Sequence, residues 1–168
     1  MKEKEIDALD KALLAALSKD GRMPIQSVGQ SLGVTNPTIR SRLTALIKSK
    51  ILNVAGLVDT SKMDGIITAF IGITLDKYNL QEKLEQISNL PGVNWAAVVT
   101  GRYDVIAEII STDGMAGLYD FLNEKLDKLG GIKSSESFVV MKAQRKWALL
   151  PEDISKKWLE EQLKIKEE

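Results

Sequence analysis

The sequence of 168 residues predicts an α+β fold built from two domains and a separate C-terminal helix. Up to residue 58 the apolar residues recur at helical spacing around a glycine-centred turn. From residue 66 onward, runs rich in β-branched residues alternate with helical patterns, and Pro151 opens a last amphipathic stretch. We therefore expect a helix-turn-helix domain over 1–58, a linker over 59–65, a βαββαβ domain over 66–150 and a C-terminal helix over 151–168.

The first helix is predicted over 5–19, where aliphatic residues between Ile6 and Leu17 share one face. Asp7 and Asp10 lie in its early turns, and acidic side chains there suit the helix dipole. This position explains the two acids better than a metal site does. An Asp-Gly pair then ends the helix.

Two further helices and a strand follow in close succession. Pro24 is suited to open a helix, Gly33 can supply the positive φ of a tight turn, and Thr35 or Asn36 can cap the next helix. A strand is predicted over 51–58. This order is typical of a winged helix-turn-helix, which usually places its second helix in the major groove of DNA.

The outer side of the third helix is polar and carries the candidate DNA contacts. Arg40 and Arg42 are the strongest of them, because an arginine can bind guanine through two hydrogen bonds or a phosphate through one. A salt bridge to the first helix is the alternative for Arg42, and Thr35 is more simply a helix cap. The candidate DNA-binding residues are Asn36, Pro37, Thr38, Arg40, Ser41, Arg42 and Lys48.

The second domain follows the order strand, helix, strand, strand, helix, strand. A turn at Pro91-Gly92 and a tight connection at 101–104 separate its elements, which is the ferredoxin-like arrangement. Its predicted strands cover 66–75, 93–100, 105–112 and 134–147, and its predicted helices cover 79–90 and 113–129.

Composition narrows the classes of function. The chain has no cysteine and no histidine, which excludes disulfides and thiolate metal sites and removes the commonest general base. Glu108, which alternates with apolar neighbours, has no partner base, so we expect no catalytic residue, no metal and no cofactor. No long apolar run and no apolar leader are present, so we expect a cytoplasmic protein without a membrane partner.

A net charge of zero conceals an uneven distribution of charge. Residues 1–62 carry 10 basic and 6 acidic side chains, whereas 63–150 carry 9 and 11, and 151–168 carry 4 and 6. The excess in the first part suits contact with phosphates but is modest. We therefore expect DNA binding to need a dimer.

Three segments and a serine pair match a known family pattern, and they are IDALDKALLAALSKDGR, GVTNPTIRSRLTALIKSKIL, TGRYDVIAEI and Ser135-x-Ser137. Through them the chain resembles the Lrp/AsnC, or feast/famine, family of transcription regulators. The resemblance implies a C-terminal domain of the RAM type that pairs two subunits back to back. It also implies homodimers that assemble further into tetramers or octamers, and small effectors, commonly amino acids, bound between subunits.

Effector-binding residues are implied by the same resemblance. In this interpretation Asp104 binds an ammonium group, Arg102 binds a carboxylate, and the two serines donate hydrogen bonds. The alternatives are a plain hairpin turn at 101–104 and outward-facing strand positions for the serines. The candidate effector residues are Gly101, Arg102, Tyr103, Asp104, Ser135 and Ser137.

The chain also departs from the family pattern. Lys50 stands where the family usually has glycine, the third helix is less basic than usual around Ser41 and Thr44, and the helix after Pro151 is an extension. The leading hypothesis is a sequence-specific DNA-binding regulator modulated by a small molecule, with an amino acid as the expected effector. One alternative is a tetrapyrrole-binding decarboxylase of similar fold, which the absence of histidine disfavours. The other is a DNA-silent partner in mixed oligomers.

Overall fold

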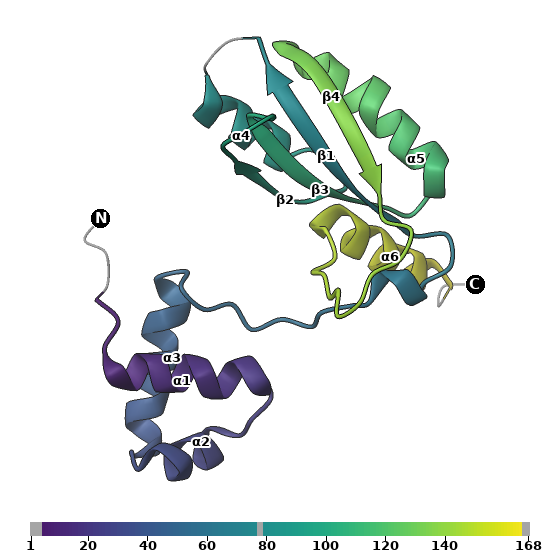
Figure 1. The fold of residues 1–168 in the computed structure, drawn as a ribbon. Helices are drawn as coiled ribbons and strands as arrows, with labels where there is room; N and C mark the ends of the chain where they lie inside the picture. The colour runs from purple at the N-terminus through teal and green to yellow at the C-terminus, as the bar shows by residue number, and fades with distance from the viewer. Residues whose placement is uncertain (1–4, 77–78, 166–168) are drawn as a thin grey trace. The chain divides into compact units, whose positions relative to one another are not determined.

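The computed structural model describes residues 5–76 and 79–165 and divides the chain into two compact units, Met1–Gly56 and Leu57–Glu168 (Figure 1). The N-terminal unit consists of helices α1 (Ala8–Lys19), α2 (Ile25–Leu32) and α3 (Asn36–Lys48). The buried side chains at its centre are Leu13, Val28, Ile39 and Leu46, at least one from each helix.

The turn between α2 and α3 is as tight as a helix-turn-helix requires. Gly33 adopts φ +67° and ends α2. A Cβ atom on Gly29 would lie 2.8 Å from the carbonyl oxygen of Val34, so no larger residue fits there without movement. The expected helix-turn-helix is therefore confirmed, including the helix start after Pro24.

The strand expected over 51–58 is not formed. The segment is irregular, and its one β-bridge joins Val58 to Ala148 through two backbone hydrogen bonds of 2.9 Å. Val54 and Leu57 are 49% and 52% exposed, and no strand is present within residues 5–56 to pair with them. The prediction of a strand was wrong because a strand needs a partner, and the local sequence does not supply one.

The end of α3 has an unusual residue at its turn. Lys50 donates its backbone N–H to the carbonyl of Ile47, and Ile51 donates to the carbonyl of Leu46, both at 3.0 Å. This pair of bonds is a Schellman motif, in which the residue after the helix cap adopts a left-handed conformation. Lys50 accordingly has φ +58°, a conformation that costs a residue with a Cβ atom about 1 kcal/mol.

The C-terminal unit contains a four-stranded antiparallel sheet with the strand order β2-β3-β1-β4 (Figure 1). This order and the element sequence confirm the ferredoxin-like arrangement. The strands are β1 (Ile67–Leu75), β2 (Val93–Val98), β3 (Val105–Ser111) and β4 (Ile132–Val139).

Helices cover one face of this sheet. They are α4 (Leu80–Ser88) and α5 (Gly114–Asp120), and α5 continues through a π-helical segment, Phe121–Leu126, and a short 3-10 helix, Asp127–Leu129. The core lies between these helices and the sheet, because alternate residues of β1 and β3 point toward the helices. Its buried members on the two central strands are Ala69, Ile71, Ile73, Leu75, Val105, Ala107 and Ile109.

The opposite face of the sheet, called here the open face, is only partly covered. Its aromatic residues include Phe70, Trp95 and Phe138, and the last two are 43% and 47% exposed. Glu108 is fully buried on this face, where it forms an ion pair with Lys146 and accepts a 2.6 Å hydrogen bond from Asn94.

The final strand is shorter than the sequence predicts. It ends at Val139 rather than continuing to residue 147, because the following segment turns back over the open face, where Lys146 reaches Glu108. Helix α6 (Glu152–Ile165) follows, as expected after Pro151. Its apolar residues Ile154 and Trp158 pack with Ile110, Ala148, Ile66 and Leu150.

Residues 59–65, expected to be a linker, contain a 3-10 helix, η1 (Thr60–Lys62). Thr60 is buried, and its hydroxyl lies 3.0 Å from that of Thr68 on β1. This segment therefore packs on the sheet as part of the C-terminal unit.

Candidate DNA-binding and effector sites

The exposed side of α3 forms a continuous stripe. Its members recur at intervals of three or four residues, so they lie on one side of the helix. We call this stripe the α3 outer face, and it consists of Pro37, Arg40, Ser41, Thr44 and Lys48, all exposed. Within residues 5–76 and 79–165, neither Arg40 nor Lys48 takes part in an ion pair.

Arg40 and Arg42 are separated by the structure, although they stand two residues apart. Arg42 turns inward to the start of α1, where it bonds to Asp7 and lies 3.4 Å from the buried carboxylate of Asp10. The backbone N–H of Asp10 and then the Arg42 guanidinium hold the pKa of Asp7 below its usual value. The salt bridge considered as the alternative for Arg42 is thus present.

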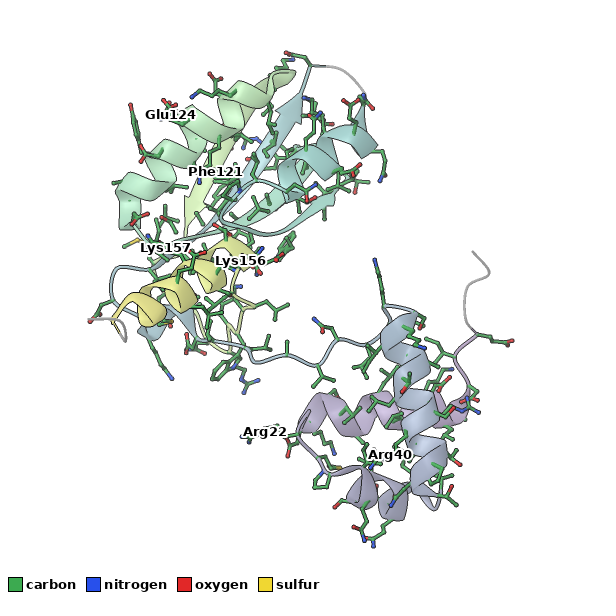
Figure 2. The ribbon with its side chains drawn as sticks, turned by 180° about the vertical axis from the view of Figure 1, so that it is seen from behind. Arg22, Arg40, Phe121, Glu124, Lys156 and Lys157 are labelled. Carbon is green, nitrogen blue, oxygen red and sulfur yellow. The ribbon has the colours of Figure 1, made fainter. Side chains whose placement is uncertain are left out.

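The remaining predicted DNA contacts lie at the start of α3. The hydroxyls of Thr35 and Thr38 are 2.9 Å apart, so Thr38 is bonded within the turn. Thr35 occupies the helix-cap position, although its side chain makes no capping hydrogen bond there. Asn36 is exposed, and its side-chain oxygen lies against Gly29. Of the two arginines of α3, Arg40 is therefore the exposed one that can contact another molecule (Figure 2).

The predicted effector turn joins β2 to β3. Gly101 has φ +117°, which favours glycine at this position. The Asp104 backbone N–H donates to Ile73 at 2.9 Å, and a carboxylate oxygen of Asp104 accepts from the Leu75 N–H at 2.8 Å. Asp104 therefore holds the turn against β1, and one of its two carboxylate oxygens is used in a hydrogen bond within the fold.

Arg102 and Tyr103 converge on a residue that the sequence analysis did not select, Glu136 of β4. The Arg102 guanidinium lies 3.1 Å from Glu136 and 5.5 Å from the centre of the Tyr103 ring. The Tyr103 hydroxyl donates to the same carboxylate, and this hydrogen bond, followed by burial, raises the pKa of Tyr103 above its usual value. We call these three residues the hairpin cluster.

Gly72 gives the hairpin cluster its floor. A Cβ atom at this position would lie 2.7 Å from the Tyr103 ring, so the ring rests directly on the β1 backbone. Gly72 is paired with Glu136 across the two strands, which places both on the open face. A residue with no side chain opposite a carboxylate is the signal that could have located this cluster.

Ser135 and Ser137 do not join the cluster. They pair with Ile73 and Ile71, whose side chains lie in the core on the helix-covered face. Because successive residues of a strand point to opposite faces, the two serines face away from Arg102 and Tyr103. Within one chain, the six predicted effector residues are therefore divided between the two faces of the sheet.

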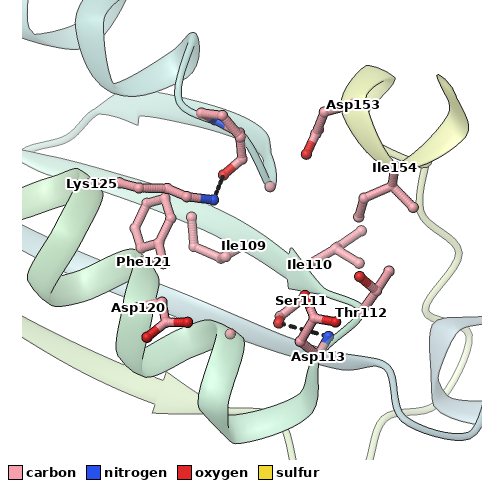
Figure 3. A pocket seen from close by; sticks show the side chains of 13 residues that line it. Ile109, Ile110, Ser111, Thr112, Asp113, Asp120, Phe121, Lys125, Asp153 and Ile154 are labelled. Atoms are coloured by element: carbon pink, nitrogen blue, oxygen red, sulfur yellow. Dashed lines mark hydrogen bonds between the residues drawn. The ribbon is translucent and has the colours of Figure 1, made fainter. Parts of the chain in front are cut away.

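A pocket lies at the end of β3 that is farther from the hairpin turn. It has a volume of about 180 Å³, and its lining includes the apolar residues Ile109, Ile110 and Ile154 and the charged residues Lys125 and Asp153 (Figure 3). Asp113 and Asp120 also line it, so its charge is negative overall and does not suit a phosphate.

Comparison with known proteins resolves the family. Residues 68–147 match the family model described as the Lrp/AsnC ligand binding domain, and residues 6–47 match that of the AsnC-type helix-turn-helix domain. The chain belongs to the Lrp/AsnC family. As a member, it is a DNA-binding transcription regulator with a ligand-binding domain.

Individual relatives agree with this assignment. An uncharacterized HTH-type transcriptional regulator of Pyrococcus horikoshii is 30% identical over 144 residues, covering 85% of this chain and 90% of the relative. The structure of E. coli AsnC is similar with a TM-score of 0.69 at 24% identity, covering 88% of this chain and all of that one. A Neisseria meningitidis regulator in complex with L-methionine has a TM-score of 0.69 at 21% identity, covering 88% and 97%.

The helix-turn-helix match includes α3 up to Ile47, one residue before its end, and the ligand-binding match includes the hairpin cluster. Helix α6 begins after the second match ends. No group of three or more acidic side chains suited to holding a metal ion occurs within the described residues. None of the helices in the described part of the chain is long and apolar enough to cross a membrane.

Proposed function

We propose that this Lrp/AsnC regulator binds duplex DNA as a homodimer through the α3 outer face and responds to an amino acid bound at the hairpin cluster. The observation that carries the DNA proposal is the contrast between Arg40 and Arg42. One guanidinium is held by carboxylates within the fold, while the other stays exposed on the stripe that a groove would meet.

The chemistry of the α3 outer face suits a DNA groove. Ser41 and Thr44 are short, so the helix backbone can approach the base edges, and Arg40 can bind guanine or phosphate. No acidic residue occurs between residues 21 and 58, so nothing acidic in that stretch repels the phosphates. Arg42 contributes indirectly, since its bonds to Asp7 and Asp10 fix α3 against α1.

A dimer supplies the affinity that one modest basic face lacks. The open face presents Phe70, Trp95 and Phe138, and exposed aromatic side chains grouped on one sheet are typical of a protein interface. Pairing two copies through this face brings two α3 helices to one DNA, and linked sites can raise binding by about 10²–10⁴-fold. Assembly into tetramers or octamers would extend the same principle.

The hairpin cluster and Asp104, which follows Tyr103 in the same turn, together suit the two charged groups of an amino acid. The Arg102 guanidinium is exposed enough to bind a carboxylate, and the second carboxylate oxygen of Asp104 can accept from an ammonium group. The L-methionine complex of the Neisseria protein supports this class of ligand. Ser135 and Ser137 could reach such a ligand only from another subunit, because they face away from the cluster in their own chain.

The DNA proposal is tested by fluorescence anisotropy with duplex DNA from the region upstream of the gene. Wild-type protein should bind at submicromolar to micromolar concentration in low salt. Arg40→Ala should weaken binding, whereas Lys11→Gln, which removes an exposed charge from α1, should not. Absence of binding by wild type, or equal losses in the two variants, would contradict the proposal.

The effector proposal is tested by a thermal-shift screen with the standard amino acids. A ligand that binds only the folded chain raises the unfolding midpoint by mass action. Arg102→Gln should abolish the shift given by the active amino acid, whereas Lys133→Gln, an exposed charge change on β4, should preserve it. A shift that survives Arg102→Gln would place the ligand elsewhere.

A further inference from the structure

Lys50 occupies a position where the backbone favours glycine. Only two described residues other than glycine have positive φ, and they are Lys50 at +58° and Arg145 at +56°. The Schellman bonds from Lys50 to Ile47 and from Ile51 to Leu46 require this conformation, so the strain cannot be avoided while α3 ends as it does.

The side chain of Lys50 makes no polar or aromatic contact with the described residues that would offset this strain. Its side chain is exposed, and no hydrogen bond, ion pair or aromatic contact of that side chain is found among residues 5–76 and 79–165. A strained residue without a folding role points to a role outside the fold. A structural alternative is a favourable interaction of the Lys50 charge with the helix dipole, but Lys48 already provides a cation in the last turn of α3.

The position of Lys50 indicates what its charge can serve. It follows Lys48 by two residues at the end of the helix whose outer face also carries Arg40, and no acid lies nearby in sequence between Arg22 and Val58. A helix that enters a groove has the phosphate backbones on either side, so a flexible lysine at its end can meet a phosphate.

We propose that Lys50 contacts a DNA phosphate and that the chain retains backbone strain at the end of α3 to hold this charge there. The inference rests on the proposed DNA binding through α3. It assigns Lys50 a role in affinity and salt dependence and none in base recognition, because phosphates carry no sequence information.

The test uses the full chain and a fluorescent 30-base-pair duplex of mixed sequence, since a phosphate contact is independent of sequence. Lys50→Gly and Lys50→Asn both remove the charge and both tolerate positive φ. We expect each to weaken binding at 0.1 M salt by roughly tenfold for each bound subunit. We also expect each to reduce the slope of log K against log salt by about 0.9 per bound subunit.

The same variants should stabilise α3. Residues 1–57 contain no aromatic residue, so fluorescence would not report on this unit, and amide hydrogen exchange of α3 peptides by mass spectrometry is the suitable measurement. Lys50→Gly should slow exchange there. Weaker DNA binding together with a more stable helix is an outcome that a purely structural role does not give.

Two further variants separate the explanations. Lys50→Arg keeps the charge and the strain and should bind with wild-type affinity and slope, while Lys11→Gln removes one exposed charge from α1 and should leave the slope unchanged. An unchanged slope in Lys50→Gly, or an equal loss in Lys11→Gln, would overturn the inference. Failure of wild-type protein to bind any duplex would instead overturn the proposed DNA binding.

Discussion

The α3 outer face and the hairpin cluster both present an exposed arginine, but they hold it differently. Arg40 has no ion pair among the described residues, whereas Arg102 lies 3.1 Å from Glu136 and over the Tyr103 ring. A DNA phosphate that approaches Arg40 therefore displaces only water. A carboxylate that approaches Arg102 has to compete with Glu136.

This difference fits two kinds of binding. A surface of unpaired cations attracts DNA at long range and without rearrangement. In the hairpin cluster, Arg102 is already paired with Glu136, so a ligand binds only if it interacts with Arg102 more favourably than Glu136 does. Binding there is therefore coupled to a change of side-chain contacts. The first arrangement serves affinity, and the second can serve as a switch.

The largest expected effect comes from breaking the open face. Phe138→Glu places a charge among Trp95, Phe70 and Tyr103, where a dimer interface could not solvate it. We expect the protein to become monomeric by sedimentation and its affinity for DNA to fall by about 100-fold, because the two α3 helices are no longer linked.

A matched control for this prediction is Tyr119→Glu. Tyr119 is 67% exposed on α5, on the other side of the sheet, and the change adds the same charge. The control should leave the dimer and DNA binding intact. A dimer that survives Phe138→Glu, or that also dissociates in Tyr119→Glu, would show that the open face is not the pairing surface.

The next effect separates the two arginines of α3. Arg40→Ala should weaken DNA binding by roughly tenfold or more and leave the unfolding midpoint unchanged, since one base or phosphate contact is worth about 1–3 kcal/mol. Arg42→Ala should lower the midpoint, followed by far-ultraviolet circular dichroism, because it removes the guanidinium beside the buried Asp10. A reversal of these two phenotypes would mean that Arg42 is the reading residue.

A smaller effect on ligand affinity is expected when the negative charge of Glu136, which competes with the ligand for Arg102, is removed. Glu136→Gln should tighten binding of the active amino acid by about two- to fivefold, the range expected from loss of an exposed ion pair. Isothermal titration calorimetry would measure it. Weaker binding in Glu136→Gln would instead make Glu136 a ligand-binding residue.

The elements that local sequence determines were predicted well. Pro24, Gly33 and the apolar spacing of α3 define a helix-turn-helix because caps, turns and helix faces depend on residues a few positions apart. The runs rich in β-branched residues likewise predicted the central strands β1 and β3. The strand predictions that were wrong concern segments whose pairing depends on residues far away in the sequence. Residues 51–57 pair with no strand, Val58 forms only a single bridge to Ala148, and β4 ends early where Lys146 returns to Glu108.

The sites divide in the same way. Exposure of Arg40 follows from helix periodicity, but the choice between DNA and Asp7 for Arg42 depends on a contact 35 residues away. Glu136 was missed because its partner Tyr103 lies 33 residues earlier and meets it only through the sheet register. Period-2 alternation could have warned that Ser135 and Ser137 face away from Glu136.

The smallest expected effect is on stability and concerns Asp7, the carboxylate that bonds to Arg42 of α3. Its pKa lies below the usual 3.8, so it favours the folded state when ionised. The stabilisation is fully present above pH 3.8 and is lost as the pH falls through the lower, folded-state value. Asp7→Asn keeps a good helix cap but cannot titrate. Wild type should therefore have a higher melting temperature than Asp7→Asn at pH 7, and this gap should be smaller at pH 2. An equal gap at both pH values would mean that ionised Asp7, bonded to the Asp10 backbone N–H and to Arg42, contributes no pH-dependent stability.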